Sequence, residues 1–309
     1  MKGFVMIGIL ALLSVLTVVP DAAQPRPHED IEGRRPIVTG ADSCLPIKLA
    51  DGMPIITASL GGRDLSFGFD TGAPGGPLLS PAVIKELKLR QTGEAQMTDP
   101  SMKNVVTTPL YELRDLKIAN FTIEKWEAAA HPARESRRFA EPDGIIGLTA
   151  FAGYVVTIDY PGRRILLAKG RLPEPDGRSS FHYEGPIPRV PLTVEGHAIE
   201  AHVDSGNARY GLIVPEALAS QLAGYAKQFP IGIARTVNNT FDLKAIPIAD
   251  ARVGDFPLYA GTAAFPSTGN RANLGSALLK DMLVLVDPAN AIVSLKRAPA
   301  GLENGCPKT

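Results

Sequence analysis

The chain of 309 residues is long enough for two lobes of ordinary size, and 45% of its residues are hydrophobic. Its 32 Lys and Arg residues balance its 32 Asp and Glu residues, so the charge gives no indication of binding to nucleic acid or to a charged membrane surface. The 30 Gly and 27 Pro residues indicate many short strands and turns rather than long helices.

The N-terminal segment is typical of a secretion signal. Lys2 precedes an apolar run of 16 residues, residues 4–19, which is short for a membrane span. We expect residues 1–23 to be a signal peptide that is removed, and the protein to be periplasmic or secreted. Asp21 is a poor residue just before that cleavage site, so an uncleaved anchor is the alternative.

Residues 24–45 are rich in proline, arginine and acidic residues, and we interpret them as an exposed linker. The two cysteines, Cys44 and Cys306, flank the rest of the chain. In an exported protein this pair predicts a disulfide, worth about 3–5 kcal/mol in the chain-entropy model, with two unpaired thiols as the alternative. Two distant cysteines and scattered histidines do not have the spacing of metal ligands, so no metal or other cofactor is expected.

Alternating hydrophobic residues predict strands along most of the chain, whereas helical patterns are sparse. Residues 170–185 are again rich in proline, glycine and charge, which places a lobe boundary near residue 180. We predict an all-β fold of two pseudo-symmetric lobes, residues 46–180 and 181–309, each with six to seven strands and a few short helices. The expected strands are residues 55–60, 65–70, 116–123, 155–159, 190–194, 199–204 and 246–253. The expected helices are residues 82–89 behind Ser80 and Pro81, residues 215–225, and short turns after Gly147 and Gly275.

Two tripeptides, Asp70-Thr71-Gly72 and Asp204-Ser205-Gly206, lie at equivalent points of an internal repeat with an offset of 134 residues. Later segments match at an offset of 128 residues, where Gly147 falls on Gly275. One such tripeptide is readily explained as a turn. Two of them in a repeat predict two carboxylates that face each other across a pseudo-two-fold axis and activate a water between them.

These motifs resemble those of the bacterial retropepsin-like and pepsin-like aspartic proteases. The resemblance covers residues 46–296, with one retropepsin-like unit in each half. In this family a hydrophobic-hydrophobic-Gly element forms a crossing strand that packs beside the Asp loop. The matching segments are Phe69-Asp70-Thr71-Gly72-Ala73 with Asp143-Gly144-Ile145-Ile146-Gly147, and Val203-Asp204-Ser205-Gly206-Asn207 with Asn273-Leu274-Gly275.

The resemblance implies that Asp70 and Asp204 are the catalytic residues. Like charges held close together cannot both ionise easily, so the pair would share one proton. The ionised member would act as general base on the water, and the protonated member would donate to the scissile carbonyl.

The resemblance also assigns supporting roles to the residues that follow each acid. The hydroxyls of Thr71 and Ser205 would hydrogen-bond to the opposite loop, and Gly72 and Gly206 would let the loops pass close to the acids.

Other positions depart from the family pattern. Some relatives have a serine at the position of Ala73 that hydrogen-bonds the carboxylate, so we expect acids that are harder to ionise and a milder pH optimum than that of a stomach-type enzyme. The position of Asn207 is uninformative. Asn273 replaces a hydrophobic residue, which predicts a less well packed crossing strand. Asp143 is a third acid, for which a turn role with Gly144 is favoured.

Two hairpins would cover the substrate, with tips at Gln96–Val106 and Ile233–Phe241. Ordinary surface hairpins are the alternative. Tyr111 lies past the first hairpin and is not expected to serve as a flap tyrosine.

We therefore predict an exported aspartic endopeptidase that acts as a monomer on an extended polypeptide between the lobes, with no nucleic-acid partner and no stable membrane span after signal removal. The alternatives are a catalytically weak or silent binding or scaffolding protein of the same fold, and a processing protease of narrow specificity.

Overall fold

The computed structural model describes residues 36, 38–98, 105–131, 142–236, 239–258, 261–267, 269–299, 305 and 306. The predicted signal peptide and most of the predicted linker lie outside the described residues. Within the described part of the chain, no helix is long and apolar enough to cross a membrane.

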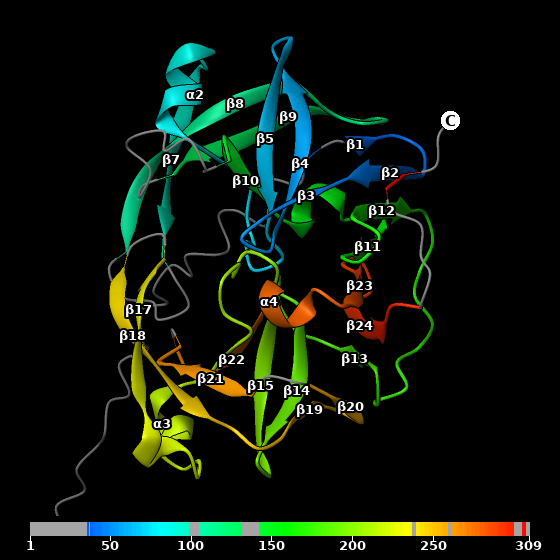
Figure 1. Cartoon of the computed structure of the whole chain (residues 1–309). Helices are drawn as coiled ribbons and strands as arrows, with labels where there is room; N and C mark the ends of the chain where they lie inside the picture. The colour runs from blue at the N-terminus through cyan, green and yellow to red at the C-terminus, as the bar shows by residue number, and fades with distance from the viewer. Residues whose placement is uncertain are drawn as a thin grey trace, which may run out of the picture.

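The described chain is nearly all β, as predicted, and forms three sheets. Figure 1 shows one nine-stranded sheet in the upper half of the molecule, a second in the lower half, and a six-stranded sheet on the right. The upper sheet contains β1 (Val38–Thr39), β3 (Lys48–Ala50), β4 (Met53–Leu60), β5 (Arg63–Phe69), β6 (Leu78–Leu79), β7 (Gln91–Met97), β8 (Val106–Ile118), β9 (Phe121–Ala130) and β10 (Gly144–Ile146). The lower sheet contains β14 (Arg189–Val194), β15 (His197–Asp204), β16 (Leu212–Ile213), β17 (Phe229–Arg235), β18 (Thr240–Pro247), β19 (Ala251–Val253), β20 (Phe256–Pro257), β21 (Thr262–Phe265) and β22 (Ala272–Gly275).

The six-stranded sheet takes strands from both halves of the chain. Its members are β2 (Ser43–Pro46), β11 (Val155–Asp159), β12 (Arg164–Ala168), β13 (Ser180–His182), β23 (Met282–Asp287) and β24 (Ile292–Arg297). In its middle, β11 pairs antiparallel with β23, and Thr157 lies opposite Leu285. These two residues are equivalent at the 128-residue offset of the repeat, so a pseudo-two-fold axis passes through this pair.

The helices are short. Helix α2 (Pro81–Glu86) begins as predicted, with the Ser80 hydroxyl accepting from the backbone N–H of Val83 and proline in the first turn. The remaining helical elements are η1 (Leu148–Phe151), α3 (Glu216–Ala219), η2 (Tyr225–Lys227) and α4 (Ser276–Leu279).

Four expectations about these elements were wrong. The strand expected at residues 116–123 is interrupted by a tight turn at Ala119, whose φ of 49° is a left-handed conformation, and becomes the β8–β9 hairpin. The strand expected at residues 246–253 is two strands, β18 and β19, and the helix expected at residues 215–225 is broken into α3 and η2. Each nine-stranded sheet also holds more strands than the six or seven expected, because very short strands such as β6 and β16 join it.

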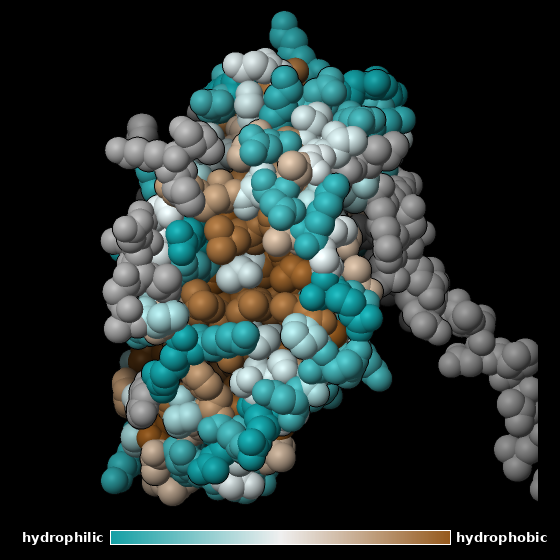
Figure 2. Space-filling model, turned by 90° about the vertical axis from the view of Figure 1, so that its right-hand side faces the viewer, coloured by the Kyte–Doolittle hydropathy of each residue, from teal (hydrophilic) through white to brown (hydrophobic). Residues whose placement is uncertain are grey.

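The core follows the alternation of each strand. In β11 and β23, Val156, Ile158, Val284 and Val286 are fully buried, while the residues between them point to the other face and are half-buried. Figure 2 shows hydrophobic residues gathered in the middle of the face that carries the six-stranded sheet. This sheet therefore buries one face against both halves of the molecule and keeps an apolar outer face.

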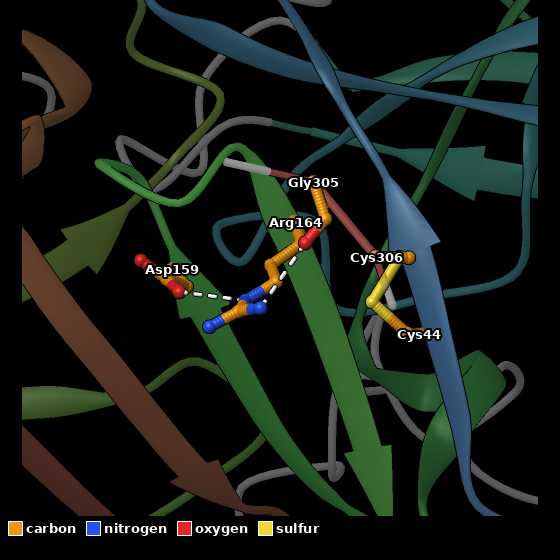
Figure 3. The surroundings of a disulfide bond; sticks show 5 residues. All are labelled: Cys44, Asp159, Arg164, Gly305 and Cys306. Carbon is orange, nitrogen blue, oxygen red and sulfur yellow. Dashed lines mark hydrogen bonds and ion pairs between the residues drawn. A yellow bond between two sulfur atoms is a disulfide. The ribbon is translucent and has the colours of Figure 1, made fainter. Parts of the chain in front are cut away.

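Cys44 and Cys306 form the predicted disulfide, which fastens the C-terminal segment to β2 (Figure 3). Beside it, the Arg164 side chain donates to the backbone oxygen of Gly305 over 3.1 Å and to a carboxylate oxygen of Asp159 over 2.8 Å. The N–H of Gly305 donates to the oxygen of Gly162 over 2.7 Å. The end of the chain is thus tied covalently to the sheet that both halves share.

The disulfide should contribute strongly to stability, because it closes a separation of 262 residues and restricts the unfolded chain. Replacing both Cys44 and Cys306 by alanine is expected to lower the free energy of unfolding by about 3–5 kcal/mol. Equilibrium unfolding in urea under non-reducing conditions measures this loss. An unchanged midpoint in the double variant would show that the bond does not constrain the unfolded ensemble.

Candidate active site

Asp70 and Asp204 lie in equivalent places, each at the C-terminal end of a buried strand. Asp70 follows β5 and Asp204 ends β15. The crossing strand β10 lies parallel to β5, and β22 lies parallel to β15. The backbone N–H of Asp70 donates to the oxygen of Ile146 in β10 over 2.9 Å, so the crossing strand holds the start of the loop in place.

The two loops are joined by four reciprocal hydrogen bonds through the hydroxyls of Thr71 and Ser205. The Thr71 hydroxyl donates to the oxygen of Val203 over 2.6 Å and accepts from the N–H of Ser205 over 3.0 Å. The Ser205 hydroxyl donates to the oxygen of Phe69 over 2.7 Å and accepts from the N–H of Thr71 over 2.9 Å. Thr71 and Ser205 are 1% and 0% exposed, so these bonds cannot be exchanged for water. They fix the distance between the loops.

Each loop glycine lies against the opposite acid. A Cβ atom on Gly72 would lie 2.8 Å from the carboxyl carbon of Asp204, closer than real side chains approach. A Cβ atom on Gly206 would meet the carboxyl group of Asp70 still more closely. Glycine is required at both positions because any side chain would push the two acids apart.

The carboxyl groups of Asp70 and Asp204 are within hydrogen-bonding reach of each other. Loss of hydration in this site raises the pKa of Asp70 well above its ordinary value, and the negative charge of Asp204 raises it further. The N–H of Gly72, which donates to Asp70 over 2.7 Å, opposes these effects without cancelling them. Asp70 therefore tends to keep a proton.

The Asp204 carboxylate has a different set of partners. One oxygen accepts from the backbone N–H groups of Gly206 and Asn207 over 2.9 and 3.0 Å. The other accepts from the side-chain amide of Asn273 over 2.5 Å. Asn207 and Asn273 thus both contact Asp204, and their side chains contact each other. Ala73, the equivalent of Asn207 in the first half, has a methyl group that cannot donate a hydrogen bond.

The crossing strand β22 is well packed despite its asparagine, contrary to the expectation from the sequence. Ala272 and Leu274 are 1% and 0% exposed, and the Asn273 side chain is hydrogen-bonded to both Asp204 and Asn207. The asparagine is tolerated because its amide has polar partners in the site. A polar residue within a buried strand was the signal in the sequence for this interaction.

Sequence reasoning did not identify a second connection between the halves, which runs through Tyr160 and Ser276. The Ser276 hydroxyl donates to the oxygen of Ser205 over 2.8 Å, and the Tyr160 hydroxyl lies 3.0 Å from it. Because the Ser276 proton is already engaged, Tyr160 is the donor. Tyr160, which belongs to the first half, thereby supports the Asp204 loop through Ser276.

Asp143 is not part of the acid pair. Its carboxylate accepts from the backbone N–H of Ser66 over 2.9 Å and from the Ser66 hydroxyl over 3.0 Å. These bonds attach the segment before β10 to β5 across 77 residues of sequence, which is a different contact from the turn with Gly144 that the sequence favoured.

The two expected hairpins are present. Met97 pairs with Val106 at the end of the β7–β8 hairpin, and Arg235 pairs with Thr240 at the end of the β17–β18 hairpin. The tips, residues 99–104 and 237–238, lie outside the described residues. In Figure 1 the two hairpins lie on the left and extend toward each other. Tyr111 lies in β8 opposite Ala128, away from the tip, as expected.

Among the described residues there is no group of three or more His, Cys, Asp or Glu side chains placed to hold a metal ion. Residues 56–150 match a family model described as aspartyl protease. A comparison with curated proteins found no match. The segment that contains the first Asp loop and the first crossing strand therefore matches the aspartyl protease family, in agreement with the resemblance drawn from the motifs.

Removing the Ser205 hydroxyl should destabilise the fold, because Ser205→Ala leaves the buried oxygen of Phe69 and the buried N–H of Thr71 without partners. We expect the free energy of unfolding to fall by about 2–4 kcal/mol. Equilibrium unfolding in urea measures this fall in the free energy of unfolding. Ser220→Ala is the matched control, because the Ser220 hydroxyl also donates to a backbone oxygen but lies on the surface. Equal losses in the two variants would contradict the role assigned to the Ser205 hydroxyl.

The raised pKa of Asp70 makes stability depend on pH. Between the unfolded pKa, near 3.8, and the raised folded pKa, the native state binds more protons, so stability falls as pH rises through this window. Asp70→Asn carries no charge and is expected to be more stable than the wild type at neutral pH, with the difference vanishing below about pH 4. Thermal unfolding across pH 3–8 tests this. Asp64→Asn, which removes an exposed carboxylate, is the control for the general loss of one negative charge.

Proposed function

We propose that this protein is an exported aspartic endopeptidase in which Asp70 and Asp204 activate a water molecule between them. The main support is the pair itself, two carboxyls within hydrogen-bonding reach, held by buried reciprocal bonds between Thr71 and Ser205. Protease chemistry is supported independently by the family match over residues 56–150.

The mechanism uses the single proton that the pair shares. The ionised carboxylate takes a proton from the water while the water oxygen bonds to the scissile carbonyl carbon. The protonated carboxyl gives its proton to the carbonyl oxygen, which yields a neutral tetrahedral intermediate. Proton transfer to the amide nitrogen then allows the C–N bond to break, and the two acids return to their original states. The fold holds both acids against one water molecule, and this positioning removes much of the activation free energy of the reaction.

The substrate that best fits the site is an extended polypeptide with apolar side chains. A small hydrophobic cluster in the first half, separate from the main core, reaches from Ala73 beside the acids to Met97 at the end of β7. Its other members are Met53, Leu78, Ala95, Leu110, Ala129 and Ile145. The backbone edges of the β7–β8 and β17–β18 hairpins would pair with such a chain.

Export is supported by the disulfide, because such bonds persist in oxidising compartments. We propose that residues 1–23 direct this export, that the mature protein is periplasmic or secreted, and that it acts as a monomer with both acids supplied by one chain.

Cleavage of a diverse peptide library between pH 3 and 8 tests the function. Wild type should cleave, and Asp70→Asn and Asp204→Asn should each lower kcat/KM by about 10³-fold or more, because either change removes the shared proton arrangement. Pepstatin should inhibit the wild type.

Asp64→Asn is the control for the general effect of removing one surface carboxylate, and it should cleave as the wild type does. Equal residual cleavage in the wild type and in both site variants would indicate a contaminant. That result would reject the proposed activity and favour a silent binding protein of this fold.

A further inference from the structure

The environments of the two acids break the symmetry of the repeat at one side chain. Asn273 in β22 occupies the position that Ile145 occupies in β10, at the 128-residue offset of the repeat. The Asn273 amide donates to Asp204 over 2.5 Å, whereas the Ile145 side chain is a hydrocarbon that can donate nothing to Asp70. Ala73, the equivalent of Asn207 in the repeat, has a methyl side chain that likewise cannot donate to Asp70.

The direction of the Asn273 hydrogen bond is fixed by a chain that starts at a backbone group. The N–H of Tyr210 can only donate, and it donates to the side-chain oxygen of Asn207 over 3.3 Å. The side-chain nitrogen of Asn207 then donates to the side-chain oxygen of Asn273 over 2.7 Å. The nitrogen of Asn273 is left facing Asp204. Each amide therefore has one orientation that satisfies all three bonds.

We propose that Asn273 is a positioning residue that places the negative charge of the pair on Asp204 and the shared proton on Asp70, so that Asp204 is the general base and Asp70 the general acid. This inference rests on the proposed function, which leaves the two roles unassigned. The N–H group of Asn273 can only donate a hydrogen bond. It therefore stabilises an ionised oxygen of Asp204, and it cannot accept a bond from the same oxygen when that oxygen carries a proton. The raised pKa of Asp70 agrees with this placement.

The assignment gives each proton a defined path. Asp204 takes a proton from the water while the water oxygen bonds to the carbonyl carbon, and Asp70 gives its proton to the carbonyl oxygen. In the second half of the reaction, Asp204 returns its proton to the departing nitrogen, and Asp70 regains a proton from the hydroxyl of the intermediate as the C–N bond breaks. No other reactant is needed.

Three titratable groups act on this site from the surrounding elements. Asp70 faces Asp204 from the opposite loop. Tyr160 contacts the Asp204 loop indirectly, through the hydroxyl of Ser276. His202 in β15 is the register partner of Asn273. Burial lowers the pKa of His202, and the charges of Arg189 and Arg271 lower it further, against the opposing effect of Asp204. A site-resolved readout is needed to separate the histidine from the acid pair.

Carboxyl ¹³C NMR titration supplies that readout, with the Asp signals assigned through Asp70→Asn and Asp204→Asn. In the wild type, we expect the Asp204 signal to be that of a carboxylate and the Asp70 signal that of a carboxylic acid where the pair holds one charge. In Asn273→Leu, the first ionisation of the pair should move up by about one pH unit, as expected for loss of a charge-assisted hydrogen bond. The acid limb of kcat/KM should move by the same amount.

Asn290→Leu is the matched control, since the Asn290 amide also donates to an aspartate, Asp287, over 2.9 Å but lies far from the pair in the chain and on the surface. It should leave the titration unchanged. Asn207→Ala provides a second variant, because it removes the group that orients Asn273 and keeps the backbone N–H to Asp204; a smaller shift in the same direction is expected.

The outcomes separate this inference from the proposed function. A wild type whose charge lies on Asp70, or an Asn273→Leu variant that is folded and titrates like the wild type, would overturn the placement of the charge. A wild type that shows the expected titration but cleaves no peptide would reject the protease activity while leaving the charge placement intact.

Discussion

The reciprocal hydrogen bonds between Thr71 and Ser205 are the constraint on which the site depends. Two carboxyl groups within hydrogen-bonding reach of each other oppose close approach, because burial and like charge both disfavour their ionisation. Four buried hydrogen bonds hold the loops together against this cost. The same pseudo-two-fold axis that relates Thr71 to Ser205 relates Thr157 to Leu285 in the six-stranded sheet. The two halves are therefore joined at two places along this axis, through the hydroxyls of Thr71 and Ser205 and through the pairing of β11 with β23.

The symmetry of the backbone does not extend to the chemistry of the acids. Both loops present a glycine to the opposite carboxyl and a hydroxyl to the opposite strand, but the amide of Asn273 contacts one acid alone. A pair that shares one proton has two equivalent arrangements unless something favours one of them. A fixed donor in the crossing strand is a simple way to favour one, and it does not disturb the backbone positions that the repeat imposes.

Most of the fold could be predicted from the sequence because its signals are local. The Ser80 cap and Pro81 indicated where α2 begins, and the alternation of Val156 and Ile158 indicated a half-buried strand. The β8–β9 hairpin was missed because its turn contains Ala119 in a left-handed conformation, for which alanine gives no local signal. The helix expected at residues 215–225 was broken because tertiary packing overrides weak helix propensity in short segments.

The sequence by itself determined the duplicated architecture, the two candidate acids and the partner cysteines, since a repeat and its two matching tripeptides can be read from the chain alone. The tertiary structure alone decided which side chains meet those acids. Asn207 looked uninformative and Asn273 looked like a packing defect until β22 was placed beside β15. Hydrogen bonds between residues 66 to 136 positions apart depend on how strands cross, and a linear pattern carries no record of that crossing.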